Sequence, residues 1–137
     1  MKKIFLSCFM LLSLISCSSD DDSGTRVQNL APPSWLLGDW RYLVSSEGGN
    51  ESLTNDGYNF ITNDVCEVYS ITTTCFKSTY GDESNFYLTE YKKNDSEYKF
   101  SVTIGNETKQ YSFSRIDQNR IKQLEGVDYQ NAVLEKI

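Results

Sequence analysis

The stretch Tyr98–Asn106, which reads YKFSVTIGN, decides the fold class of this chain. Every second residue from Tyr98 to Ile104 is apolar, and the residues between them are polar. This alternation predicts a β-strand with one buried face. Gly105 and Asn106 follow as two residues that tolerate the positive φ of a tight hairpin turn. The sequence therefore predicts a strand, a two-residue turn and a returning strand over residues 107–116.

The register of this hairpin follows from the turn and from the aromatic residues on both strands. With a two-residue turn, Phe100 lies opposite Tyr111 and Tyr98 lies opposite Phe113. Turn chemistry and hydrophobic pattern thus agree on one pairing. The preceding hairpin is less determined, because its first strand, residues 86–91, can present either of two faces to residues 98–104. One register pairs Tyr87 and Tyr91 with Val102 and Tyr98, and the other pairs Phe86 and Leu88 with Val102 and Phe100.

The rest of the chain alternates short aromatic and β-branched segments with clusters of Gly, Asn, Asp and Ser. This pattern predicts an all-β domain of about eight short strands, without a convincing amphipathic helix. The expected strands include residues 40–44, 57–62, 65–71, 72–80, 121–124 and a last segment ending at Ile137. Sequential tight turns favour an antiparallel up-and-down meander that closes into a small eight-stranded barrel, because closure removes the sheet edges. A β-sandwich is the alternative.

The N-terminus has the layout of a secretory signal, which we assign to residues 1–16. A basic start precedes an apolar run, Ile4–Ile15, which is too short to cross a membrane as a helix. The run ends in Leu14-Ile15-Ser16-Cys17, which resembles the lipobox of bacterial lipoproteins. That resemblance implies cleavage before Cys17, a diacylglycerol thioether on its sulfur and acylation of the new amino group. Several acyl chains would anchor the protein stably to a membrane.

The residues after Cys17, Ser18–Ser23, are polar and acidic. They resemble the acidic surface-export signal of some Gram-negative lipoproteins. This implies an outer-membrane lipoprotein on the periplasmic or the surface-exposed face. A solvated acidic linker is the simpler interpretation of the same composition. We predict that residues 17–31 form a flexible acidic tether and that residues 32–137, from Pro32-Pro33 onward, form one domain.

Charge and composition exclude several functions. Removal of residues 1–16 leaves 121 of the 137 residues and changes the formal net charge from −6 to −8, because Lys2 and Lys3 are lost. Nucleic acid is therefore not an expected partner. The chain contains no histidine, so it cannot itself supply a Ser-His-Asp or Cys-His nucleophile system or a histidine-ligated metal. We predict no enzymatic activity, no catalytic residue, no metal site and no cofactor.

Two cysteines remain in the expected domain, Cys66 and Cys75. In an oxidising compartment an intramolecular disulfide between them is the default expectation, and two buried free thiols are the alternative.

The start of the domain contains Gly38-Asp39-Trp40, which resembles the Gly-x-Trp motif of lipocalin-like domains. In that family the motif begins the first strand, and the tryptophan closes one end of an eight-stranded barrel. The resemblance implies that Gly38 allows a sharp turn and that Trp40 buries its ring at the closed end. The long helix of typical lipocalins has no counterpart in the sequence. A barrel of this length can also be filled by its own side chains.

Two functions follow as hypotheses. The first is an outer-membrane or surface lipoprotein that binds a small apolar or amphipathic ligand in a lipocalin-like barrel, with Tyr87, Tyr91 and Tyr98 as candidate ligand contacts. Ordinary half-buried strand positions are the simpler interpretation of these tyrosines. The alternative is a non-enzymatic envelope protein whose solid β-domain binds another protein.

Overall fold

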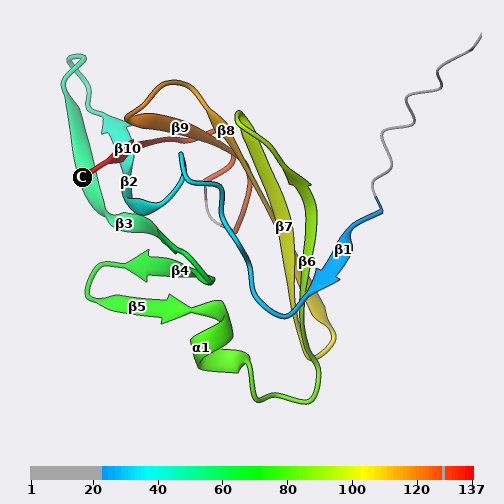
Figure 1. Cartoon of the computed structure of the whole chain (residues 1–137). Coiled ribbons are helices and arrows are strands. Elements are labelled where there is room, and N and C mark those ends of the chain that lie inside the picture. Colours follow the sequence, from blue (N-terminus) through cyan, green and yellow to red (C-terminus); the bar gives the residue numbers. More distant parts are fainter. Residues whose placement is uncertain (1–22, 128) are drawn as a thin grey trace, which may run out of the picture.

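The computed structural model describes residues 23–127 and 129–137, and Figure 1 shows their arrangement. The protein is all-β, with ten strands and one short helix, α1 (Phe76–Tyr80). The strands are β1 (Thr25–Val27), β2 (Gly38–Ser45), β3 (Glu51–Ile61), β4 (Asp64–Tyr69), β5 (Thr72–Cys75), β6 (Phe86–Lys93), β7 (Glu97–Ile104), β8 (Glu107–Arg115), β9 (Arg120–Glu125) and β10 (Val133–Lys136).

All ten strands belong to one antiparallel sheet, in the order β1-β6-β7-β8-β9-β10-β2-β3-β4-β5. Strands β6 to β10 and strands β2 to β5 form two meanders, and the pairing of β10 with β2 joins them. The sheet curls but does not close, because β1 and β5 are its two edges. The predicted meander is present, whereas the eight-stranded barrel is not confirmed. One continuous sheet also differs from the two sheets of a sandwich.

The predicted hairpin of residues 98–116 is confirmed together with its register. Phe100 pairs with Tyr111 and Tyr98 pairs with Phe113. In the preceding hairpin Phe86 pairs with Ile104 and Leu88 pairs with Val102. Phe86 and Leu88 therefore lie on the core face, as in the second register considered, but each pairs two residues further along β7 than expected. A register shift between Glu90 and Lys92 interrupts this pairing.

The helix α1 corrects the expectation of a strand over residues 72–80. The strand β5 ends at Cys75, and Phe76–Tyr80 turn into one short helix. Its cap is remote in sequence: the Asp64 carboxyl group accepts hydrogen bonds from the amides of Lys77 and Ser78, both at 3.0 Å. These amides are the orphan donors that begin any helix. A carboxyl group 13 residues upstream cannot be recognised as a cap from local sequence.

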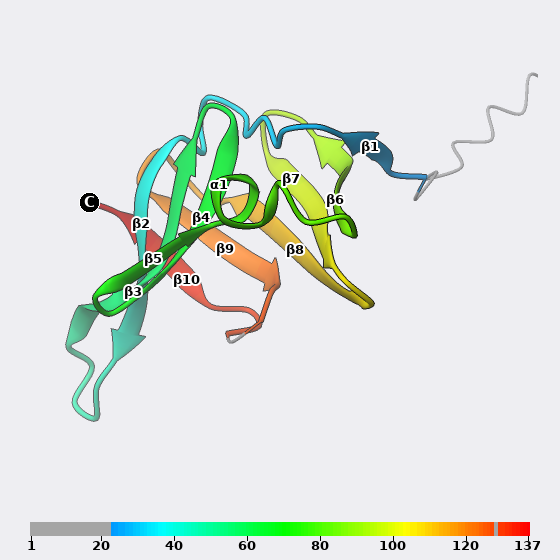
Figure 2. The same ribbon diagram turned by 90° about the horizontal axis from the view of Figure 1, so that it is seen from below.

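The folded part of the chain also begins earlier than predicted. Within the segment expected to be a tether, Thr25–Val27 form β1 and pair with β6, and Leu30 is fully buried. The physical reason is that β6 would otherwise be an open edge, and edges are commonly covered by another segment. In Figure 2, β1 lies beside β6 at the margin of the sheet.

The inside of the curled sheet is filled mainly by aromatic rings. Six large side chains are each at most 2% exposed, namely Trp40, Tyr58, Phe60, Phe100, Tyr111 and Phe113. Phe113 makes edge-to-face contacts with Tyr58 and Phe60, with ring centroids 5.0 and 5.1 Å apart. Such pairs add to the stabilisation that burial alone gives. The core is therefore solid along most of its length.

Candidate functional site

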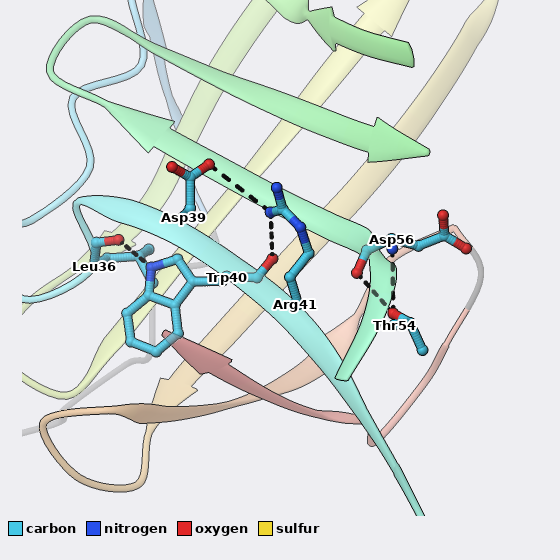
Figure 3. Close-up of polar contacts among 6 residues, drawn as sticks. All are labelled: Leu36, Asp39, Trp40, Arg41, Thr54 and Asp56. Atoms are coloured by element: carbon cyan, nitrogen blue, oxygen red, sulfur yellow. Dashed lines mark hydrogen bonds and ion pairs between the residues drawn. The ribbon is translucent and has the colours of Figure 1, made fainter. Parts of the chain in front are cut away.

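The Gly38-x-Trp40 motif lies at one end of the curled sheet, which we call the tryptophan end (Figure 3). Gly38 has a φ of +123°, a conformation that side-chain-bearing residues rarely adopt. The Trp40 ring is fully buried, and its indole N–H donates to the Leu36 carbonyl oxygen at 2.7 Å. The Lys136 ammonium group lies 5.5 Å from the ring centroid. Gly38 thus begins β2 in a conformation that favours glycine, and Trp40 is buried in the core. The expected closure of a barrel end by Trp40 is not confirmed, because the sheet stays open.

The backbone around Trp40 is also held from its other side (Figure 3). The Arg41 guanidinium group donates to the Trp40 carbonyl oxygen at 3.1 Å and lies 3.8 Å from the Asp39 carboxylate. On the neighbouring β3, the Thr54 hydroxyl donates to the Asp56 carbonyl oxygen at 3.0 Å. These contacts order the strands. The indole itself is fully buried and is therefore inaccessible to a ligand.

The disulfide between Cys66 and Cys75 is present, as predicted. The two residues pair directly across β4 and β5. The bond therefore ties the edge strand β5 to the sheet immediately before α1 begins.

The three candidate ligand-contact tyrosines do not form one site. Tyr98 faces the core, is fully buried and donates its hydroxyl to Glu90 at 2.6 Å. Burial, and then the bond to Glu90, raise the pKa of Tyr98 well above its ordinary value. Tyr87 and Tyr91 instead lie on the face of the sheet opposite the core. The Arg26 guanidinium group covers the Tyr87 ring, and the Tyr91 hydroxyl is 3.3 Å from that of Ser101.

A pocket of about 180 Å³ lies at the end of the sheet opposite Trp40, and we call it the mouth pocket. Its apolar part is formed by Phe76, Tyr80, Val102 and Ile104. Its polar part includes Glu67, which accepts the Tyr111 hydroxyl at 2.7 Å. The volume is below the 300 Å³ at which typical small-molecule sites begin. Sequence reasoning missed it, because it depends on α1.

Deeper in the core, tyrosine hydroxyl groups form a polar network. The Tyr42 hydroxyl donates to the side-chain oxygen of Gln123 at 2.7 Å, and both residues are buried. Burial raises the pKa of Tyr58 far above its ordinary value, and the neighbouring Tyr42 raises it further. The Tyr58 hydroxyl therefore stays neutral, so it is suited to holding the core together rather than to proton transfer.

A second depression, of about 360 Å³, lies on the outer side of the sheet, and we call it the outer depression. Its apolar lining comes from Leu43, Ile116, Ala132 and Val133. Leu43 and Val133 are the sequence neighbours of the buried Tyr42 and Leu134, which places them on the opposite face of their strands.

The rim of the outer depression is charged. Arg120 lies on this rim and forms ion pairs with two carboxylates, with nitrogen–oxygen distances of 3.7 Å to Glu51 and 3.2 Å to Glu135. Leu53, which pairs with Leu43, and Ile116 are 43% and 52% exposed. An apolar surface rimmed by charges is typical of an interaction site. A sequence signal for it exists, namely the apolar residues Leu43 and Val133 at outward positions of β2 and β10.

The anchor residue predicted from the lipobox, Cys17, lies outside the described residues. Within residues 23–127 and 129–137, no three acidic or cysteine side chains are grouped so that they could hold a metal ion. The same part of the chain contains no helix with the length and hydropathy of a membrane span.

Comparison with known protein families, with curated proteins and with solved structures gives no match for this chain.

Proposed function

We propose that this chain is a non-enzymatic lipoprotein of the outer membrane, anchored through lipid on Cys17, whose β-domain binds another envelope protein. The filled aromatic core is the observation that carries the choice of a protein partner. A small ligand of ordinary size has no room inside the curled sheet. Binding on the outer surface needs no internal volume.

We place the protein contact at the outer depression. Leu43, Ile116 and Val133 offer apolar area, and the ion-paired Arg120 supplies a polar rim. A partner that fits inserts one or two apolar side chains and meets the rim with hydrogen-bonding groups. The acidic charge of the domain favours a partner with a basic surface.

The test uses two isoleucines as a matched pair. Ile116 lies in the outer depression, whereas Ile71 is 99% exposed on the turn between β4 and β5. Tagged full-length protein with Ile116→Lys or Ile71→Lys is purified from mildly solubilised membranes. We expect wild type and Ile71→Lys to recover the same stoichiometric protein and Ile116→Lys to lose it. Recovery by Ile116→Lys, or no stoichiometric partner for the wild type, would reject the proposal.

The mouth pocket favours a second function, the binding of a small amphipathic ligand at the open end of a lipocalin-like sheet. Its charged lining consists of Glu67, Glu107 and Lys109, so carboxylates outnumber the single ammonium group. With the apolar wall, this lining would suit a short alkyl chain that ends in an ammonium or hydroxyl group. Calorimetric titration with hexylamine, with hexanoate as the oppositely charged control, tests this directly. Saturable binding of the amine that Ile104→Trp abolishes is expected. No heat from the amine, or equal binding of both compounds, would exclude such a ligand.

A further inference from the structure

The position of β1 determines how far the domain can lie from the proposed anchor. Thr25 pairs with Glu90 and Val27 pairs with Leu88. The Arg26 guanidinium group lies 3.4 Å from the Tyr87 ring centroid. Gly24 also packs closely, because a Cβ at this residue would be 2.4 Å from the Thr89 side chain. The chain is therefore held against β6 from Gly24 onward.

This contact shortens the connection to the membrane. Only six residue steps separate Cys17 from Ser23, the first described residue. Whatever their conformation, covalent geometry limits this span to about 22 Å. If the chain were free up to Ala31, the limit would be about 50 Å. The short span rests on the lipid anchor proposed above.

The direction of β1 selects which end of the domain lies near the anchor. Because β1 and β6 are antiparallel, the described chain before Thr25 lies toward Tyr91 rather than Tyr87, and a Cβ at Gly24 would be 2.5 Å from the Tyr91 ring. Strand β6 ends two residues later, at Lys93. The next residues, 94–96, form the turn between β6 and β7. This turn belongs to the tryptophan end, while the mouth pocket and the turn at Gly105 lie at the other end.

The side chains at this turn suit a lipid–water interface. The Trp35 indole N–H donates to the Asn94 carbonyl oxygen at 2.8 Å, and its ring is partly exposed. Lys93 is exposed at the end of β6. Tryptophan combines an apolar body with a polar edge, which suits the boundary between lipid and water. The exposed ammonium group of Lys93 can donate to headgroup phosphates, and the neighbouring Asp95 leaves the turn without a net charge.

We propose that Trp35, Lys93 and the turn of residues 94–96 face the membrane surface and contact lipid headgroups. The mouth pocket then points away from the membrane. The partner in this contact is the bilayer itself, and the contact is set by the short connection before β1.

Energy transfer to the membrane tests this orientation. Lipidated full-length protein carrying Asp95→Cys or Asn106→Cys is labelled with a donor dye and placed in vesicles that contain a headgroup-labelled acceptor lipid. Both positions lie in turns, one at each end. We expect at least about twofold more efficient transfer from position 95. Equal transfer, or more from position 106, would overturn the orientation.

A spacer variant separates the orientation from the anchor. Twenty Gly and Ser residues inserted between Asp22 and Ser23 leave the described fold intact and lengthen the connection several-fold. The difference between the two labels should then largely disappear, and a difference that persists would overturn the role of the short connection. Flotation of the vesicles is measured in parallel. Protein that does not float rejects the anchor and with it this inference, whereas floating protein with equal transfer rejects the orientation alone.

Discussion

The remote cap of α1 allows a quantitative prediction. Asp64 is 3% exposed, and its carboxyl group accepts hydrogen bonds from the amides of Val65, Lys77 and Ser78 and from the Ser78 hydroxyl. Asp64→Ala leaves these donors without their acceptor. Each buried donor left unpaired costs about 1–3 kcal/mol. The Ser78 hydroxyl can turn to another partner, and the helix amides are only part-buried and can recover water. We therefore take the lower bound for each of the three amides and expect a loss of about 3 kcal/mol.

Three further variants give the expected order of effects. Asp64→Asn keeps one acceptor oxygen and should cost about 1–2 kcal/mol. Ser78→Ala removes only the hydroxyl contact and should cost less than about 1 kcal/mol. Asp56→Ala is the matched aspartate control, since Asp56 accepts one amide hydrogen bond from the exposed Ser70. It should also cost about 1 kcal/mol or less.

Urea unfolding of the oxidised protein, followed by far-UV and near-UV circular dichroism, measures these losses. An unchanged m-value would show that the variants differ in stability alone. Asp64→Ala should also weaken the near-UV signal, because Phe76 on α1 packs 5.3 Å from the Tyr111 ring. A loss below about 1 kcal/mol for Asp64→Ala, or a loss equal to that of Asp56→Ala, would refute the role of Asp64 as the cap.

Three other predictions concern the core. The raised pKa values of Tyr58 and Tyr98 keep both side chains neutral in the folded state. In the unfolded chain both ionise near pH 10. The free energy of unfolding should therefore fall above that pH by about 1.4 kcal/mol per pH unit for each tyrosine. Tyr58→Phe should reduce this slope in alkaline urea titrations, and an identical slope would contradict the assignment. Cys66→Ala with Cys75→Ala should lower stability by about 2–3 kcal/mol relative to the oxidised wild type but not relative to the reduced wild type. Trp40→Phe removes the hydrogen bond to Leu36 and part of a buried ring, so a loss of about 2–4 kcal/mol is expected, and calorimetry showing an unchanged melting temperature would argue against it.

What could be predicted from sequence was largely local. The hairpin of β7 and β8 was predictable because alternation and turn chemistry act on neighbouring residues and agree. The burial of Trp40 was expected from the Gly-x-Trp resemblance, and the disulfide was expected because only Cys66 and Cys75 remain in the expected domain. The pairing of β1 was not, because Thr25–Val27 carries no distinctive pattern and gains its order from the open edge of β6.

The candidate sites also differ in whether neighbouring residues or distant contacts determine them. The outer depression was accessible in principle, since Leu43 and Val133 break the alternation on the outward faces of β2 and β10. The mouth pocket was not, because α1 depends on a cap from Asp64 on another strand. The tyrosines chosen as ligand contacts were separated by the strand faces, since Tyr98 points into the core and Tyr87 lies beneath Arg26.

The disulfide has a consequence for the path by which such a protein would reach its membrane. Under the export that we propose, a precursor in the reducing cytosol would lack the bond between Cys66 and Cys75 and therefore about 2–3 kcal/mol of stability. For a domain of ordinary marginal stability, that shortfall raises the unfolded fraction roughly 30- to 150-fold. An export channel that threads extended chains would thus receive a substrate that still yields easily. Oxidation after export would then make unfolding less favourable, and formation of the disulfide would thereby oppose return of the chain through the channel.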